Sequence, residues 1–331
     1  MKPTLVTGAT GFLGKHLVER LRPRSPDEGR LRLLCRGSSP WDGQPDVEVV
    51  RGDIESAADV ARAMDGAGHV YHLAGLVSRH PRDAARLYRV HIEGTRNVCE
   101  AALRHSPDRI VVASSSGAIA VGPTPVVHDE NSGYKNDVVA EWPYYLSKIF
   151  AEKLALDYVR LHQLPIVVVN PSLLFGPGDD RGSSTGDIRL FLEGQVRTVP
   201  LGGLNFLDAR DAAAGLVSAM RAGRAGERYL LGGPNWTFRE LIQAVARLAG
   251  SRAPTRQLSV PLSLAGAGIL RRLYPLAGKQ FRLDEASIKM SALFWYCSSA
   301  KAQAELGFET RHPTETLRDT VDDLRRRRMA A

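Results

Sequence analysis

The sequence predicts an α/β fold, in which a doubly wound parallel β-sheet is followed by a smaller, irregular cap. Two observations carry this prediction. The first half of the chain alternates short β-branched runs with longer segments of helical periodicity, which is typical of a parallel sheet covered by helices. After Pro171, clusters of glycine and proline separate shorter elements. The 331 residues, 44% hydrophobic and 24% charged, suit one large or two small globular domains and exclude disordered and fibrous classes.

Six strands are predicted in the first half, each a short apolar run, at residues 4–7, 31–35, 47–50, 69–73, 109–114 and 165–170. Helices are predicted between them, at residues 12–21, 56–64, 84–103 and 145–162. Each of these segments has the length that a crossover between parallel strands requires. Together the elements define a first domain over residues 1–170.

The rest of the chain, residues 171–331, is predicted to form a substrate-binding cap. Residues 205–225 are expected to return to the first domain, so that the two domains interleave. One helix of the cap is well marked, because Thr237 and Glu240 form a capping box before an apolar stripe that ends at Gly250.

Residues 260–273 are the most apolar stretch of the sequence. One interpretation is a core helix of the cap, and we favour it because the segment has no strongly charged opposite face. The other is a helix on a membrane surface, with its arginines at the headgroups and its large apolar side chains in the lipid (Leu262, Leu264, Ile269, Leu270, Arg271, Arg272).

The charge balance and the cysteines exclude several classes of protein. The 44 Lys and Arg against 36 Asp and Glu give a net charge of +8, and scattered charge of this kind does not predict a nucleic-acid partner. No apolar run is long enough to span a membrane, and residues 1–7 do not resemble a signal peptide, so we expect a cytoplasmic protein with at most peripheral membrane association. Cys35, Cys99 and Cys297 are far apart and are expected to be buried thiols.

A glycine-rich loop joins the first strand to the first helix. It reads Thr7-Gly8-Ala9-Thr10-Gly11-Phe12-Leu13-Gly14. Gly8 permits a tight turn, Gly11 lets a pyrophosphate approach the backbone, and Gly14 lets the helix pack closely on the strand. Glycines also collect in ordinary turns, but the position between a strand and a helix is the context that dinucleotide binding demands. The first domain is therefore predicted to be Rossmann-like and to bind a nicotinamide dinucleotide.

The end of the second strand distinguishes between the two nicotinamide cofactors. An acidic residue there binds the ribose 2′-hydroxyl of NAD(H), whereas an arginine accommodates the 2′-phosphate of NADP(H). This sequence has Arg36, followed by Ser38 and Ser39, with no acid before Asp42. We therefore favour NADP(H). NAD(H) is the alternative if Arg36 is simply an exposed arginine.

Two further loops are candidate cofactor contacts, although each could be an ordinary loop. Asp53 and Ile54 follow the third strand, where a carboxylate can accept a hydrogen bond from the adenine amino group. Leu73, Ala74 and Gly75 follow the fourth strand, where small residues let a cofactor cross the sheet edge.

Tyr144 and Lys148 are spaced i and i+4 on one predicted helix face, just after Pro143. A nearby ammonium favours phenolate and is expected to lower the pKa of the tyrosine, which suits acid–base chemistry, and the same lysine can hold the cofactor ribose. Tyr145 is the rival tyrosine, but its i+4 partner is Ile149.

Three serines, Ser114, Ser115 and Ser116, end the preceding strand at the carboxyl edge of the sheet, where ligands sit in open α/β folds. A hydroxyl there can polarise a substrate carbonyl or alcohol, although serines at strand ends also form turns.

With these motifs in order, the chain resembles the extended short-chain dehydrogenases/reductases, the superfamily of NAD-dependent epimerases and dehydratases. The resemblance covers nearly the whole chain, including segments at residues 170–179, 207–213, 226–233 and 300–307. Within that superfamily it is most similar to dihydroflavonol-reductase-like proteins and to hopanoid-associated sugar epimerases.

The resemblance implies a catalytic triad of Ser115, Tyr144 and Lys148, with Ser116 as the alternative serine. In these roles Tyr144 exchanges the alcohol proton, Lys148 tunes it and holds the nicotinamide ribose, and Ser115 orients the substrate oxygen. The resemblance also places residues 171–174 along the nicotinamide carboxamide and implies a homodimer formed through helices 84–103 and 145–162. The full set of expected cofactor contacts is Gly8, Thr10, Gly11, Phe12, Leu13, Gly14, Arg36, Asp53, Ile54, Leu73, Ala74, Gly75, Ser114, Tyr144, Lys148, Pro171, Leu173 and Leu174.

Two positions depart from the pattern of the superfamily. His91 stands where an asparagine is usual, and it can also donate or accept a hydrogen bond. Leu173 replaces the asparagine that holds the sugar diphosphate in nucleotide-sugar enzymes, and a leucine cannot bind phosphate. This second departure argues against a nucleotide-sugar substrate.

The leading functional hypothesis is an NADP(H)-dependent oxidoreductase that interconverts a ketone and a secondary alcohol on a fairly apolar small molecule. The expected pocket lining is Leu76, Val77, Ile119, Phe175, Phe206 and Trp295. Alternatives are an epimerase, a dehydratase or a hydroxysteroid-type dehydrogenase/isomerase that uses NAD(P) as a transient hydride store, or a non-catalytic cofactor-binding protein. Metal catalysis is not expected, because His69, His72, His80 and His91 lack converging carboxylates or thiols at ligand spacing.

Overall fold

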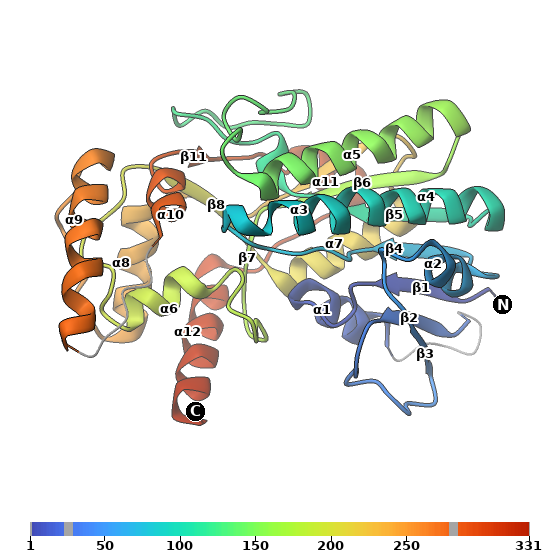
Figure 1. Cartoon of the computed structure of the whole chain (residues 1–331), viewed down its shortest axis with the longest axis horizontal. Helices are drawn as coiled ribbons and strands as arrows, with labels where there is room; N and C mark the ends of the chain where they lie inside the picture. The colour runs from blue at the N-terminus through green and yellow to red at the C-terminus, as the bar shows by residue number, and fades with distance from the viewer. Residues whose placement is uncertain (1, 23–28, 278–283, 331) are drawn as a thin grey trace.

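The computed structural model describes residues 2–22, 29–277 and 284–330, and it contains the doubly wound parallel sheet that the sequence predicts. Seven parallel strands lie in the order β3-β2-β1-β4-β5-β6-β9 (Figure 1). Thr4 of β1 is in register with Leu31 of β2 and His69 of β4, so the chain winds outward in both directions from the centre of the sheet. The strands are β1 Thr4–Thr7, β2 Leu31–Cys35, β3 Val47–Arg51, β4 His69–His72, β5 Arg109–Ala113, β6 Ile166–Pro171 and β9 Arg228–Leu231.

The six predicted strands are all present, with ends that differ by one residue at most, because each is a short run rich in apolar residues between turn residues. The seventh strand, β9, is not among the predicted strands. Its four residues follow a helix of the second half of the chain and join β6 at the edge of the sheet, with Val169 paired to Tyr229. Four residues carry too little periodicity to be recognised as a strand from sequence alone.

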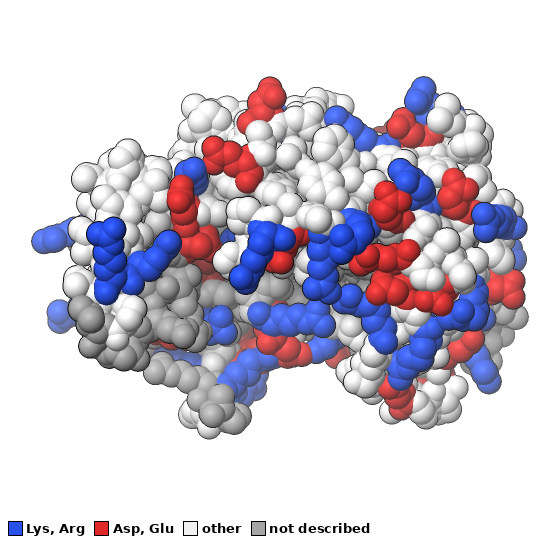
Figure 2. Space-filling view, viewed as in Figure 1, with Lys and Arg blue, Asp and Glu red and all other residues white. Residues whose placement is uncertain are grey.

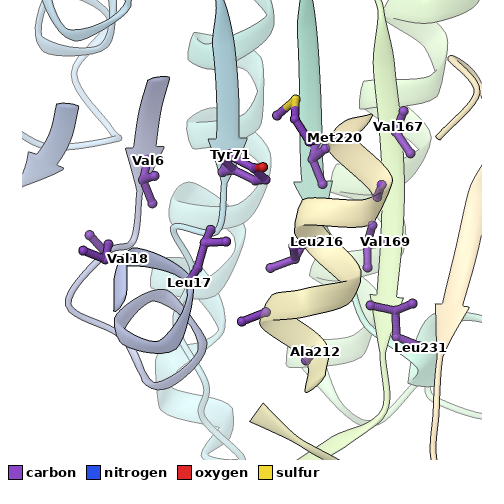
Figure 3. Packing of buried hydrophobic residues seen from close by; sticks show 14 of the residues in the cluster. Val6, Leu17, Val18, Tyr71, Val167, Val169, Ala212, Leu216, Met220 and Leu231 are labelled. Atoms are coloured by element: carbon purple, nitrogen blue, oxygen red, sulfur yellow. The ribbon is translucent and has the colours of Figure 1, made fainter. Parts of the chain in front are cut away.

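Helices cover both faces of this sheet. One face packs against α1 Phe12–Leu21, α7 Ala209–Ala222 and α11 Ala300–Leu306, and the other against α2 Ala57–Met64, α4 Gly94–His105 and α5 Pro143–His162. Figure 3 shows part of the first layer, where Leu216 and Met220 of α7 lie over Val167 and Val169 of β6. Burial of these side chains supplies the main driving force for folding of the domain.

The helix predicted at residues 84–103 is interrupted. A short 3₁₀ turn, η2 Pro81–Asp83, leads into α3 Ala84–Tyr88, and a π-helical turn, η3 Arg89–Glu93, separates α3 from α4. A π turn inserts an extra residue into the helix and rotates the side chains around it, and such turns are frequent at functional sites. This turn carries the buried His91.

The cap lies at one end of the sheet, at the left in Figure 1. A small sheet in the order β10-β8-β11, with β7 also paired to β8, packs against helices of the C-terminal half. Of the residues 205–225 expected to return to the first domain, the helix α7 packs against α1, whereas the strand β8 belongs to the small sheet. The cap elements are β7 Leu173–Phe175, α6 Gly186–Leu192, β8 Gly203–Asp208, β10 Asn235–Thr237, α8 Phe238–Ala249, α9 Val260–Leu273, η5 Tyr274–Ala277, α10 Glu285–Met290, β11 Phe294–Trp295 and α12 Pro313–Ala330.

Three other predictions can be compared with the structure. The capping box of Thr237 and Glu240 starts α8 as predicted, and all three cysteines are buried thiols. The helix at residues 260–273 also forms, but Ala267 is its only buried residue, so the core helix favoured from the sequence is wrong. Within the described residues, no helix has both the length and the hydropathy to cross a bilayer.

Candidate functional site

A cavity of about 910 Å³ lies between the carboxyl ends of the central strands and the cap. Its floor comes from the loops after β1, β4 and β5 and from β6, and its walls come from α5, α6, α8, α9 and α10. The carboxyl edge of an open parallel sheet is where ligands bind in such folds, and the volume suits a cofactor together with a small substrate. Fourteen of the predicted site residues line it: Gly8, Gly11, Phe12, Leu13, Gly14, Leu73, Gly75, Ser114, Ser115, Tyr144, Lys148, Pro171, Leu173 and Leu174.

The glycine loop has the tight geometry that its sequence predicts. Gly8 has a φ of +75°, and a Cβ added there would lie 2.6 Å from the backbone nitrogen of Ala74. A Cβ on Gly14 would lie 2.1 Å from the carbonyl oxygen of Gly8. Gly11 is the N-cap of α1 and has no side chain to satisfy the first backbone N–H groups of the helix. This cradle fits a pyrophosphate, whose oxygens can accept those N–H groups at the positive end of the helix dipole.

Two of the expected cofactor residues, Arg36 and Asp53, lie beside the cradle rather than in the cavity wall. They follow β2 and β3, with the Arg36 Nη1 4.0 Å from the Asp53 Oδ2, and their side chains are 54% and 39% exposed. Both are therefore accessible to a ligand that extends outward from the glycine loop. Of the two serines beyond Arg36, Ser38 is exposed, but Ser39 is buried and its Oγ accepts the backbone N–H of Trp41.

Three further predicted residues do not line the cavity. Thr10 is half-buried within the glycine loop. Ile54 is buried in the core against Gly94. The backbone N–H of Ala74 donates to the hydroxyl of Thr7, 3.2 Å away, which ties the loop after β4 to the end of β1.

Tyr144, Lys148 and Ser115 meet on one wall of the cavity. Tyr144 and Lys148 lie in the first two turns of α5, which begins at Pro143, and Ser115 follows β5. The side chains of Tyr144 and Ser115 both line the cavity. The ammonium of Lys148 donates to the carbonyl oxygen of Ala113, 2.9 Å away, at the end of the same strand. The rival Tyr145 also lines the cavity, where its ring packs against Trp295.

The pKa of Tyr144 differs from the sequence expectation. Burial raises the pKa of its phenol to about 12, and the hydrogen bond with Ser115 acts in the lowering direction. Burial also lowers the pKa of Lys148 to about 8, since a low-dielectric surrounding disfavours the charged ammonium. The expected lowering of the Tyr144 pKa by Lys148 is not seen in this structure, because burial raises that pKa and the lowering influence on it comes from Ser115.

His91 organises the surroundings of Tyr144. Its Nε2 accepts the backbone N–H of Leu76 at 3.1 Å, so its Nδ1 carries the proton and donates to the Oγ of Ser147 at 2.7 Å. Ser147 in turn donates to the carbonyl oxygen of Tyr144 at 2.8 Å. Burial lowers the pKa of His91 to about 2. The ring therefore stays neutral, with one nitrogen as acceptor and the other as donor. The histidine thus joins the loop after β4 to the first turn of α5.

Sequence reasoning missed a buried carboxylate, Glu152, one turn beyond Lys148 on α5. It is 1% exposed, and its oxygens accept from the amide of Asn170 at 2.7 Å and from the hydroxyl of Tyr134 at 3.2 Å. The guanidinium of Arg228 lies 3.4 Å away, and the negative charge of Glu152 acts to raise the pKa of Lys148. The spacing i, i+4, i+8 from Tyr144 is the sequence signal that could have identified it.

An ion pair closes one side of the cavity and was also missed. Arg79, in the loop after β4, donates to both carboxylate oxygens of Asp187 in α6, at 3.0 and 2.9 Å, and to the Oγ of Ser287 in α10, at 2.8 Å. It thereby links the first domain to two helices of the cap. Of the expected apolar lining, Leu76, Val77, Phe175 and Trp295 face the cavity, whereas Ile119 and Phe206 are core residues.

Two serine hydroxyls at the sheet edge, those of Ser114 and Ser172, are buried against the cavity, and among the described residues neither has a hydrogen-bond partner. Buried hydroxyls are normally hydrogen-bonded, so a ligand with polar groups along this edge would satisfy them. The glycine cradle and these two hydroxyls together fit a bound nicotinamide dinucleotide.

Comparisons with known proteins agree with this geometry. Residues 4–232 match the model of the NAD dependent epimerase/dehydratase family. The chain is 33% identical over 330 residues to a Synechocystis sp. protein named as a dihydroflavonol 4-reductase, covering 96% of this chain and 92% of that protein. It is 31% identical over 343 residues to the sterol demethylase protein B of Methylococcus capsulatus, covering 98% and 99%. The crystal structure of gox2253 superposes with a TM-score of 0.83 at 31% identity, covering 99% of both chains.

The family match extends over more than half of the chain and contains the glycine loop, the serines and the Tyr144 and Lys148 pair. The two relatives span nearly the full length of the chain, cap included. The protein belongs to the NAD-dependent epimerase/dehydratase family of extended short-chain dehydrogenases/reductases and is an NAD(P)-dependent enzyme of the oxidoreductase type.

Proposed function

We propose that this protein is an NADP(H)-dependent oxidoreductase that interconverts a ketone and a secondary alcohol on a fairly apolar molecule, with Ser115, Tyr144 and Lys148 as its catalytic residues. One observation carries the proposal. Ser115, Tyr144 and Lys148 lie together on the wall of the same cavity whose floor is the glycine cradle. A proton donor thus shares one cavity with a site that fits the cofactor.

The proposed chemistry gives each of the three residues on this wall one role. When bound, the nicotinamide of NADPH supplies two electrons and one hydrogen, as hydride, to the ketone carbon. Tyr144 gives its phenolic proton to the ketone oxygen, so that the product is the alcohol, and a proton from solvent restores the phenol. The hydroxyl of Ser115 donates to the same oxygen and polarises the carbonyl. In this proposal Lys148, whose ammonium donates to the carbonyl oxygen of Ala113, holds the ribose of the bound cofactor.

The substrate class follows from the lining of the cavity. Beyond Tyr144 the walls contain Leu76, Phe175 and Trp295, and Leu173 contributes an apolar side chain where a sugar diphosphate would need a hydrogen-bond donor. The name of the Methylococcus relative refers to a sterol, and sterol ketones are apolar test substrates of the right class.

The experiment that tests this function measures cofactor stoichiometry. Purified protein is incubated with NADPH and a panel of apolar ketones, and NADPH absorbance and alcohol product are followed together. A reductase consumes one NADPH for each alcohol, whereas an epimerase or dehydratase that stores the hydride transiently converts substrate without net consumption. We expect Tyr144→Phe to lower kcat/KM by about 100-fold or more, and Tyr88→Phe, a control outside the cavity, to leave it unchanged. Full turnover by Tyr144→Phe would remove the proposed mechanism.

The preference for NADP(H) rests on Arg36 and has its own test. The half-exposed guanidinium beside the cradle, with Ser38 next to it, can bind a 2′-phosphate. We expect calorimetric titration to give a preference for NADPH over NADH of about tenfold or more, equivalent to about 1.4 kcal/mol. Arg36→Ala should abolish this preference, and Arg160→Ala, an exposed arginine on α5, should retain it. Equal binding of both cofactors by the wild type would point to NAD(H) instead.

The homodimer implied by the resemblance is also proposed, through α4 and α5. Three large apolar side chains on these helices are exposed, with Leu103 at 37%, Phe150 at 42% and Leu161 at 63%. Light scattering should then give twice the chain mass of 36.1 kDa, and Phe150→Glu should shift the protein toward the monomer. A monomer at micromolar concentration would overturn this proposal.

A further inference from the structure

Helix α9 lies between the cavity and the exterior at one end of the molecule, among the residues that the structure describes. Figure 1 shows α9 at the left edge of the cap, beyond α8 and α10. Val260, Ser263, Ala267 and Leu270 of this helix line the cavity. Their spacing of three to four residues places them on one helix face, so this face of α9 is a wall of the substrate site.

The outer side of α9 is also apolar. Leu262 is 60% exposed, Ile269 is 59% exposed and Leu273 is 52% exposed. The intervals of seven and four residues place these three side chains in one stripe along the helix. A helix on the surface of a water-soluble domain normally turns charged residues outward, and a stripe of exposed leucine and isoleucine marks an interaction site. The structure therefore leaves both sides of α9 apolar.

The surroundings of this stripe are basic. Over the described residues 241–277 the chain has five arginines and no Asp or Glu, and the next described residues, Asp284 and Glu285, begin α10. Arg271 and Arg272 lie in the last turn of α9, directly between Ile269 and Leu273 in sequence. Figure 2 shows Lys and Arg, and no Asp or Glu, on the visible face at the left edge of the molecule, where α9 lies. An apolar stripe with flanking arginines is complementary to an anionic, partly apolar surface.

We propose that α9 docks this protein on an anionic lipid surface, with Leu262, Ile269 and Leu273 in the boundary between headgroups and acyl chains and the arginines at the phosphates. A second copy of the chain is a poorer occupant. Pairing of α9 with α9 about a two-fold axis would bring the same arginine-bearing helix, which has no acidic residue of its own, against itself. A lipid surface satisfies the apolar stripe and the positive charge together.

This docking goes beyond the proposed function and narrows its substrate class. The outer side of α9 would lie in lipid while the inner side lines the cavity, so a substrate that resides in the bilayer has to pass only one helix to reach Tyr144. We therefore infer that the substrate is a membrane-resident apolar alcohol or ketone. The inference on docking needs neither cofactor nor turnover, and it can fail independently of the proposed chemistry.

Vesicle sedimentation with the full chain tests the proposal. The probes are vesicles of phosphatidylcholine alone and vesicles with one phosphatidylglycerol for every two phosphatidylcholines. We expect binding to the anionic vesicles that high salt weakens. The double variant L262S/I269S should bind at least about tenfold more weakly, because it replaces two exposed apolar side chains that would be buried in the lipid on docking. R271Q/R272Q, which keeps the apolar stripe, should lose about tenfold or more on anionic vesicles and little on neutral ones.

The matched control is V126S/V127S, which replaces two apolar side chains of similar exposure, 53% and 52%, far from α9 in sequence. Its vesicle binding should equal that of the wild type, and NADPH titration confirms that each variant is folded. Absence of binding to anionic vesicles, or equal binding by L262S/I269S, would overturn the proposal. A dimer in light scattering that L262S/I269S converts to a monomer would also overturn it and assign the stripe to a second copy of the chain.

Discussion

Replacement of Lys148 by methionine should stabilise the protein at neutral pH while it abolishes turnover. The ammonium of Lys148 is withdrawn from water beside Tyr144, and burial lowers its pKa from 10.5 to about 8. The folded protein therefore bears a free-energy cost for keeping the lysine charged at pH 7, a cost that the unfolded chain does not have. Methionine has a similar length and no charge, so it removes the cost with little change in packing.

The size of the effect follows from the pKa. A fall from 10.5 to about 8 corresponds to about 3 kcal/mol, and this is an upper bound because part of the side chain keeps contact with solvent, which screens the charge. The variant also loses the hydrogen bond to the carbonyl oxygen of Ala113, which contributes about 1 kcal/mol. The net gain at pH 7 is then at most about 2 kcal/mol. For a chain of 331 residues this corresponds to a rise in Tm of at most about 3 °C.

The sign of the pH dependence distinguishes this origin from a packing effect. Below pH 8 the lysine is protonated in both states, and the full cost is present. Between pH 8 and pH 10.5 the unfolded chain binds more protons than the folded one, so the wild type gains stability as the pH rises. At pH 10 the remaining cost is below about 1 kcal/mol, and the advantage of the variant should disappear.

Thermal unfolding of the wild type and Lys148→Met at pH 7 and pH 10 measures this difference, and other titrating groups cancel in the comparison. Lys153→Met is the matched control on the same helix, where the ammonium lies 4.8 Å from the ring centroid of Tyr134. That variant should show no gain in Tm at either pH. A Lys148→Met variant that is less stable than the wild type at pH 7, or equally stabilised at both pH values, would refute the reasoning.

Three other substitutions test the site. Gly14→Ala should weaken NADPH binding by at least about tenfold in titrations, because the added Cβ would lie 2.1 Å from the carbonyl oxygen of Gly8. The control Gly268→Ala, where an added Cβ meets nothing within 4 Å, should bind NADPH normally. Equal affinities of the two variants would argue against the cradle. Glu152→Gln should lower the free energy of unfolding by about 3 kcal/mol in urea, since it leaves the charge of Arg228 without its buried partner, and an unchanged midpoint would contradict this. His91→Asn should keep more kcat than His91→Leu, because only the asparagine can still accept and donate hydrogen bonds to the neighbouring loop and helix; equal rates would show that the network does not position the site.

The sheet could be predicted from the sequence because its strands are local signals. The central strands are short, mostly apolar runs that are largely buried, and residues 4–7 and 31–35 agree with β1 and β2 at both ends. The π turn at His91 could not be predicted, since apolar spacing continues through it and only tertiary contacts select it. The exposure of α9 has the same cause, because an apolar stripe alone does not reveal whether protein, ligand or lipid covers it.

Motifs predicted the residues of the candidate site better than the contacts between them. The glycine loop and the pair of Tyr144 and Lys148 are sequence patterns with a fixed spacing, and both line the cavity. Contacts such as Arg79 with Asp187 join residues more than a hundred positions apart. Nothing in the spacing of such residues indicates that they meet, because the fold alone brings them together.

The pKa of Tyr144 has a consequence for the direction of the proposed reaction. A phenol with a pKa of about 12 holds its proton throughout the neutral range, so Tyr144 is ready to act as an acid toward a ketone oxygen and is a poor base toward an alcohol. In the proposed enzyme, desolvation of the wall formed by Tyr144, Ser115 and Lys148 therefore favours ketone reduction at neutral pH. Alcohol oxidation should become competitive only as the pH rises toward the range where the phenol ionises, and the ratio of the two rates measured across pH tests this directly.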